Sequence, residues 1–369
     1  MRETPKTMPV SIYFVWQWWE KHCLGAAERP ATIDMDWMDK AYIARQRFLH
    51  EHFAEFGIGA GQPVVDKAFL SKVMPFHTMI IPVALGMDIE IQEYGGYAWQ
   101  NMTEDQLKKL KPVDIANTAA GEVILKQRQE RLDRYGMATQ MIDLASVTNN
   151  AFMMRGPEFY ADLIVEKDFA RHYMGAIRET MCMAYRSISG LFGPIDGFPL
   201  GNCNVTMMSP DLYDEMICQY DMDCVKYAAE LTGKKPNCQL HHCNVKTEPF
   251  AETYGRIPGL TSLQGSYQSD IRKIHEVLPG IDFSAMVNPV ELLSRPLADV
   301  FQDLEISIAS GAANLAIWDI DSTFSPEKMK ELFDGIRNVA DKCGRKAVFS
   351  VIPIGWEELA WEFPQYVKR

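Results

Sequence analysis

Short apolar runs alternate with amphipathic segments after Gly136, and this alternation constrains the fold more than any other feature of the chain. Residues 141–149, 281–288 and 313–321 are such apolar runs, and residues 325–344 show the helical spacing of apolar side chains. Runs of this kind indicate buried strands, and a repeated strand–helix order indicates βαβ units around a parallel sheet. The number of units fits a (β/α)8 TIM-type barrel, so we predict an α/β fold of that class.

Residues 1–135 add an N-terminal strand, helices and a hairpin to the predicted barrel. Residues 10–16 form a buried strand in this interpretation, residues 36–57 a helix that ends at Gly57, and residues 89–100 a hairpin. No repeat, low-complexity tract or linker divides the chain of 369 residues. We therefore predict a single barrel domain over residues 1–369.

Composition and charge exclude several classes of protein. The formal net charge of −12 argues against a nucleic-acid or anionic-membrane partner. No apolar stretch is long enough to cross a bilayer, and the polar first residues do not form a secretory signal. Eight scattered cysteines then indicate free thiols in a reducing compartment, so we expect a cytoplasmic protein. The sequence leaves open whether the chain forms a homodimer.

The stretch NCQLHHC, residues 237–243, ends a predicted strand with a histidine and a cysteine two positions apart. Alternate side chains of a strand share a face, so His241 and Cys243 should point the same way and His242 the opposite way. An imidazole and a thiolate at one place are two of the three protein ligands of a catalytic zinc site. The H-x-C pattern alone is weak, and a core cysteine beside a hydrogen-bonded histidine explains it equally well.

Polar side chains also follow other predicted strands, where barrel enzymes place catalytic groups. Asp319 and Asp321 share one face of a strand end and offer a third ligand or a base, although capping or loop roles are commoner for aspartate. Asn202 and Asn288 are candidates to bind substrate, with turn chemistry as the simpler explanation for each. His77 is a candidate to donate a proton to a substrate oxygen, although a lone histidine is more often structural.

Aromatic rings are concentrated in residues 13–22, YFVWQWWEKH. Tyr13, Trp16 and Trp18 are candidates to line a pocket for a flat or cationic ligand. Packing in the core is the alternative, and we expect it for at least half of the rings in this stretch.

The order of these segments resembles the uroporphyrinogen decarboxylase superfamily from about Met8 to the last predicted helix. Residues 8–25 occupy the place of that superfamily's N-terminal segment, and residues 78–96 and 285–321 are similar to two later blocks. Its decarboxylases bind tetrapyrrole carboxylates with N-terminal arginines, but residues 16–19 here read WQWW. The resemblance therefore points to the superfamily's other branch, the corrinoid-dependent methyltransferases.

That branch carries the pattern L-H-x-C-G on a strand and a third ligand, usually cysteine, far downstream. Leu240, His241 and Cys243 match the pattern, and Asn244 replaces its glycine. No cysteine stands at the downstream position, where aspartates precede the sequence SPEKM. The resemblance thus implies Zn²⁺ bound by His241, Cys243 and Asp321. If neither Asp319 nor Asp321 is the third ligand, Cys203, which follows another predicted strand, and Glu248 are the next candidates.

The resemblance further implies transfer of a methyl group from a methoxylated aromatic donor to Co(I). The cobalamin would be supplied by a separate corrinoid protein, because this chain has no cobalamin-binding D-x-H-x-x-G pattern. Zinc, His77 and Asp319 would serve the release of the phenolate oxygen, which is a poor leaving group without a Lewis acid or a proton donor. The alternatives are methylation of a thiol by methyl-Co(III), a decarboxylase-like enzyme, or a barrel without metal.

Overall fold

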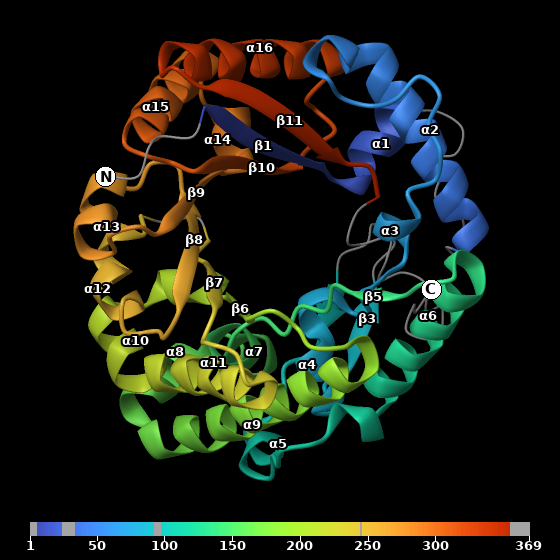
Figure 1. The fold of residues 1–369 in the computed structure, drawn as a ribbon. Coiled ribbons are helices and arrows are strands. Elements are labelled where there is room, and N and C mark those ends of the chain that lie inside the picture. The colour runs from blue at the N-terminus through green and yellow to red at the C-terminus, as the bar shows by residue number, and fades with distance from the viewer. Residues whose placement is uncertain (1–5, 24–33, 92–96, 244–245, 355–369) are drawn as a thin grey trace. The chain divides into compact units, whose positions relative to one another are not determined.

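The computed structural model describes residues 6–23, 34–91, 97–243 and 246–354 and has an α/β fold (Figure 1). The chain divides into two compact units. Unit 1 comprises residues 1–70, 244–248 and 264–364, and unit 2 comprises residues 71–243, 249–263 and 365–369. Strand β8, Leu260–Ser266, contributes its first four residues to unit 2 and its last three to unit 1.

Unit 1 is built on parallel strands. Strand β1 (Thr7–Phe14) pairs in parallel with β10 (Asn314–Ile320) on one side and with β11 (Lys346–Ile352) on the other. β10 pairs in parallel with β9 (Asp282–Val287), which neighbours β8. Five of the six residues of β9 are buried, as expected for a parallel strand that is covered on both faces.

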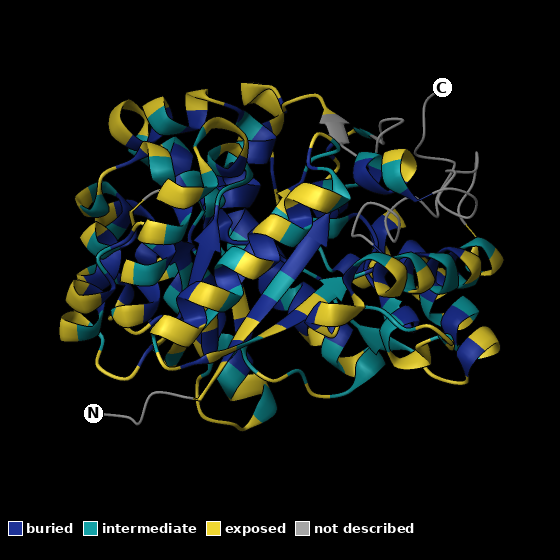
Figure 2. Ribbon diagram, turned by 90° about the horizontal axis from the view of Figure 1, so that it is seen from above, coloured by how far each residue is buried: buried dark blue, intermediate teal, exposed yellow. Residues whose placement is uncertain are grey.

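Helices of unit 1 cover this sheet. They are α1 (Trp16–His22), α2 (Met35–Phe53), η1 (Ala54–Phe56), α3 (Lys67–Leu70), α13 (Ile271–Val277), α14 (Pro289–Ser294), α15 (Leu297–Ala309) and α16 (Pro326–Lys342). Figure 1 shows α15 and α16 alongside β11, β1 and β10. Met329, Phe333 and Ile336 form the buried face of α16, while its outer residues are exposed (Figure 2). Ser325 caps this helix through the N–H of Lys328.

Unit 2 contains strands β6 (Phe198–Gly201) and β7 (Cys238–His241), which are parallel and pair Gly201 with His241. β7 neighbours the first residues of β8. Strands β2 (Lys72–Val73) and β5 (Thr139–Gln140) form a short parallel pair. Strands β3 (Ile89–Ile91) and β4 (Tyr97–Trp99) are antiparallel, which confirms the predicted hairpin.

The helices of unit 2 include the longest of the described elements, α9. They are η2 (His77–Met79), α4 (Ile80–Ala84), α5 (Glu104–Lys108), η3 (Ile115–Asn117), α6 (Ala119–Tyr135), α7 (Val147–Arg155), α8 (Glu158–Val165), α9 (Lys167–Phe192), η4 (Cys203–Met207), α10 (Pro210–Met216), α11 (Cys218–Thr232) and α12 (Ala251–Tyr254). The short helix η5 (Glu248–Phe250) has its first residue in unit 1 and its other two residues in unit 2. α9 packs on α7 and α11, and its buried residues recur at helical spacing.

The strand predicted for residues 141–149 is wrong, because local hydrogen bonds replace the sheet ladder there. β5 ends at Gln140, and α7 begins at Val147. The Asp143 carboxylate accepts the N–H of Ala145, and Ser146 caps α7 by accepting the N–H of Asn149. Short polar side chains that bond nearby backbone groups favour caps and turns over strands.

The predicted α/β class with a parallel sheet is confirmed by the pairings of β1, β6, β7, β9, β10 and β11. Closure into a (β/α)8 barrel and a single domain over residues 1–369 stay predictions. Within the described ranges, no helix has both the length and the hydropathy needed to cross a bilayer.

Candidate metal centre

Cys203, His241 and Cys243 converge in unit 2. One ligand atom from each residue lies within 4.8 Å of the other two, and all three side chains are half-buried. His241 is the last residue of β7, and Cys203 begins η4 directly after β6. β6 and β7 are parallel, and Gly201 lies opposite His241. The carboxyl ends of the two strands therefore lie side by side, which places Cys203 next to His241 and Cys243.

His242 is buried apart from these ligands and is anchored in the core. Its side chain is 0% exposed, and its ring packs against Phe250 and Tyr254. Nδ1 lies 2.7 Å from the Tyr254 hydroxyl. Burial lowers the pKa of His242 to about 3, with the charge of His241 as a smaller cause, so this imidazole is neutral near pH 7.

Hydrogen bonds lower the pKa of the Cys203 thiol. A hydrogen bond with Cys243 is the largest cause that lowers the pKa of Cys203 to about 4; burial opposes it, and His241 and Asn149 add further hydrogen bonds. The thiolate is the form in which cysteine binds metals. Two sulfurs and one imidazole are a donor set that zinc accepts, and three protein ligands leave a fourth position open.

The third member of this group is Cys203, at the place for which the sequence predicted Asp321. The sequence offers Cys203 only as an alternative third ligand, and the pairing of β6 with β7 brings it to the histidine. Asn244, which replaces the glycine of the family pattern, lies outside the described residues.

Asp321 and Asn288, two of the predicted site residues, make local hydrogen bonds in unit 1. The Asp321 carboxylate accepts the N–H of Thr323 at 2.8 Å, and such bonds with Thr323 lower its pKa. Asn288 caps α14 by accepting the N–H of Val290 at 2.9 Å. These are the cap and turn roles that the sequence offered as alternatives; metal binding by Asp321 and substrate binding by Asn288 stay predictions.

Asn202, another predicted substrate-binding residue, belongs to a buried polar network in unit 2. Its Nδ2 donates to the Tyr213 hydroxyl at 3.2 Å and to Asp221 at 3.1 Å, and Tyr213 donates to the same carboxylate at 2.6 Å. Burial raises the pKa of Asp221 to about 6, against the opposing effect of these hydrogen bonds. The network satisfies the Asn202 Nδ2 but not its buried Oδ1, and the role of Asn202 in substrate binding stays a prediction.

The two predicted catalytic residues, His77 and Asp319, both have left-handed backbone. Their φ angles are 48° and 57°, and among the described non-glycine residues only Phe76 and Ala145 share a positive φ. Such conformations are costly for residues with a side chain and are often found at functional sites. His77 belongs to unit 2 and Asp319 to unit 1, and their catalytic roles stay predictions.

The three aromatic residues proposed to bind substrate are buried in unit 1. Tyr13, Trp16 and Trp18 are at most 2% exposed. The Trp18 ring stacks on Phe14 with the centroids 3.8 Å apart, and its indole N–H donates to the Phe324 carbonyl at 2.6 Å. These contacts are those of core packing, which was the alternative interpretation, and substrate binding by the three rings stays a prediction.

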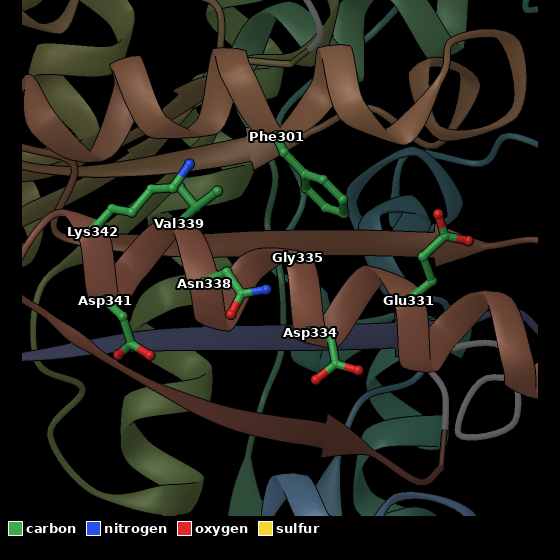
Figure 3. Close-up of a pocket in the computed structure, with 8 residues that line it drawn as sticks. All are labelled: Phe301, Glu331, Asp334, Gly335, Asn338, Val339, Asp341 and Lys342. Atoms are coloured by element: carbon green, nitrogen blue, oxygen red, sulfur yellow. The ribbon is translucent and has the colours of Figure 1, made fainter.

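An open groove lies between α15 and α16 in unit 1 (Figure 3). Its volume is about 830 Å³, and its lining includes Glu331, Asp334 and Asp341. A Cβ added to Gly335 would lie 1.9 Å from the Phe301 ring, so the missing side chain lets this ring approach α16. None of the residues predicted to be functional lines the groove.

The chain is similar in fold to a solved methyltransferase. The structure of a methyltransferase from Methanosarcina mazei matches with a TM-score of 0.55 and 13% sequence identity, over 88% of this chain and 99% of that one. At 13% identity, this similarity supports a shared fold and nothing more. No family model matches the sequence, and no curated protein matches it either.

Two glycoside hydrolases match with TM-scores too low to support an argument. An exo-β-1,4-mannosidase from Opitutaceae bacterium strain TAV5 has a TM-score of 0.40 and 12% identity, over 93% of this chain and 51% of that one. An intracellular xylanase from Thermoanaerobacterium saccharolyticum has a TM-score of 0.33 and 11% identity, over 71% and 98% of the two chains.

Proposed function

We propose that this protein is a zinc-dependent methyltransferase. The observation that carries the proposal is the convergence of Cys203, His241 and Cys243, a ligand set of two thiols and one imidazole. The similarity in fold to a methyltransferase and the L-H-x-C pattern at residues 240–243 support the same class of reaction.

The three residues fit zinc in both chemistry and protonation. Zinc favours sulfur and nitrogen donors, and the lowered pKa of Cys203 favours the thiolate form that binds metals. When bound, the ion would supply a Lewis acid at its fourth position, which lowers the pKa of a thiol or assists an oxygen that leaves.

Residues behind the ligands hold them in one orientation. His242 is neutral and packed against Phe250 and Tyr254, so the end of β7 is fixed from the face opposite the ligands. With His242 held in this way, His241 and Cys243 present their donor atoms to Cys203. Little rearrangement is then needed for binding, which favours affinity.

The two cysteines favour a thiol as the methyl acceptor. Two thiolate ligands donate more electron density than one thiolate and one carboxylate, which suits activation of a thiol better than release of a phenolate. In this reaction the thiolate sulfur attacks the methyl group of a methylcobalamin, the carbon–cobalt bond breaks, and its electron pair stays on cobalt as Co(I). We propose that the cobalamin is carried by a separate corrinoid protein, as the family resemblance implies.

Demethylation of a methoxylated aromatic is the second candidate. The sequence favours it through Tyr13, Trp16 and Trp18, its candidates to hold the ring of such a donor. In that direction Co(I) attacks the methyl carbon, and the phenolate oxygen leaves with the bonding electrons. His77, in the same unit as the three ligands, is then a candidate to provide a proton to that oxygen.

Metal analysis and corrinoid spectra test the proposal together. We expect one zinc per wild-type chain, and no stoichiometric zinc in Cys203→Ala or Cys243→Ala. Cys343→Ala is the matched control, because Cys343 is also half-buried but lies outside the group. Wild-type protein without zinc, or full zinc in both ligand variants, would contradict the metal centre.

The direction of transfer is read from the cobalt spectrum. With methyl-Co(III) corrinoid protein and a panel of thiols, thiol methylation produces Co(I). With Co(I) corrinoid protein and a panel of methoxyarenes, demethylation produces methyl-Co(III). Absence of methyl transfer with every thiol and every methoxyarene, from a zinc-loaded protein, would refute the methyltransferase assignment.

A further inference from the structure

We propose that Asn149 is a positioning residue of the metal centre, which holds Cys203 where an ion can bind it. The inference deepens the proposed function and rests on it. Asn149 lies in the first turn of α7 and is 4% exposed, so its amide is committed to partners within the protein.

The start of α7 is tied to the end of β6. Ser146, the N-cap of α7, accepts the N–H of Asn149 at 3.2 Å, and its hydroxyl donates to the carbonyl of Gly201 at 2.8 Å. Gly201 is the last residue of β6, two positions before Cys203. The segment that carries the third ligand is therefore held from its N-terminal side by the cap of this helix.

The Asn149 amide holds the same segment from its C-terminal side. Its Oδ1 accepts the backbone N–H of Asn204 at 2.9 Å and the Asn204 Nδ2 at 3.2 Å. Because a backbone N–H can only donate, this bond fixes which end of the amide is oxygen. Nδ2 is then the end of the Asn149 amide that can donate to the Cys203 sulfur, and a hydrogen bond with Asn149 is among the causes that lower the pKa of Cys203.

The turn before α7 is in a conformation that few residues adopt. Ala145 has a φ of 56°, in the left-handed region, and its N–H is held by Asp143 at 2.7 Å. A strained backbone persists only where its surroundings determine it. The hydrogen bonds of Ser146 and Asn149 are part of those surroundings, and they tie this turn to the segment that carries Cys203.

A side chain that hydrogen-bonds to a metal ligand affects how tightly the metal is bound. Groups that hydrogen-bond to ligands orient them and tune their electron donation, and their removal costs about 10–100-fold in metal affinity. We expect Asn149→Ala to weaken zinc binding to that extent, because both the anchor at Asn204 and the donor to Cys203 are lost. The cobalt(II)-substituted protein should show a shifted sulfur-to-metal charge-transfer spectrum.

Asn150→Ala is the matched control. Asn150 is the next residue of α7 and is 0% exposed, but its amide donates to the carbonyls of Leu144 and Ser146. We expect this variant to lose stability and to keep the zinc affinity and the cobalt spectrum of the wild type. Equal losses of affinity in the two alanine variants would overturn the inference, since Asn149 would then matter only for folding.

Asn149→Asp tests the amide if the alanine variant does not fold. The carboxylate still accepts from Asn204, so the segment stays anchored, but it cannot donate to Cys203 and adds a negative charge beside it. We expect weaker zinc binding and an altered cobalt spectrum. Zinc binding as tight as that of the wild type, or tighter, would overturn the inference. A wild-type protein that binds neither zinc nor cobalt is a different result, which refutes the proposed function itself.

Discussion

At the scale of single residues, the metal centre depends on which cysteine meets the H-x-C pair. The pair itself follows from the sequence, because the period of a strand places His241 and Cys243 on one face. The third ligand does not, because it depends on which strands are neighbours. Cys203 is 38 positions before His241 in the chain, but the pairing of Gly201 with His241 brings the two residues close together in space.

Alanine substitutions at Cys203 and Asp321 should therefore differ. Cys203→Ala removes a ligand and should lower zinc affinity by more than the ~10–100-fold that outer partners cost. Asp321→Ala removes only an acceptor for the N–H of Thr323 and should keep stoichiometric zinc. Competition with a chromophoric zinc chelator measures both affinities. Loss of zinc in Asp321→Ala, with full retention in Cys203→Ala, would restore the ligand set predicted from the sequence.

At the scale of elements, the strongly periodic segments were predictable and the locally hydrogen-bonded ones were not. The helix α16, with its Ser325 cap, and the strand β10 follow from apolar spacing and capping residues. Residues 141–149 have an apolar content typical of a strand. The side chains of Asp143 and Ser146 nevertheless accept hydrogen bonds from nearby backbone N–H groups, which favours a turn and a helix cap. Core packing was expected for at least half of the N-terminal aromatic rings, but which of them are buried depends on tertiary contacts that no local pattern encodes.

The buried carboxylate on α11 gives a pH dependence with a definite sign. The pKa of Asp221 is raised to about 6 from an ordinary value near 4, so the folded state holds this proton more tightly than the unfolded state. Its contribution to stability is full below about pH 4 and is lost as the pH rises to about 6. Over that window the change is on the order of 2–3 kcal/mol.

Comparison with Asp221→Asn isolates this contribution. The difference in the free energy of unfolding, wild type minus variant, should move in favour of the wild type as the pH falls from 7 to 4.5. Groups such as His242 titrate in both proteins and cancel in the difference. Chemical denaturation at several pH values provides the measurement, and parallel pH profiles would show that Asp221 is not perturbed.

At the scale of the whole molecule, the parallel α/β class was predictable from the alternation of strand and helix. The division into two units, with β8 contributing to both, was not, because it depends on long-range contacts rather than on a linker. The ligands of the candidate centre all belong to unit 2 and come from sequence segments that are far apart. Binding of an ion to them should therefore stabilise that unit.

Removal of the metal should lower the melting temperature. An ion present at about 100 times its dissociation constant stabilises the folded state by roughly 2.7 kcal/mol. For a chain of this length we expect a decrease of a few °C on chelation and full recovery when zinc is restored. Differential scanning calorimetry measures the shift, and Cys203→Ala should show none. If the melting temperature of the wild type changed neither on addition of the chelator nor on addition of zinc, the ion would have no effect on stability.

The hydrogen atom that serves as the side chain of residue 335 sets the spacing of two helices. With no carbon atom at that position, the edge of the Phe301 ring lies directly against the backbone of α16. This close contact of the Phe301 ring with the backbone contributes to how closely α15 approaches α16, which packs on β11. A side chain larger than hydrogen at residue 335 would collide with the Phe301 ring unless the ring or one of the two helices shifted.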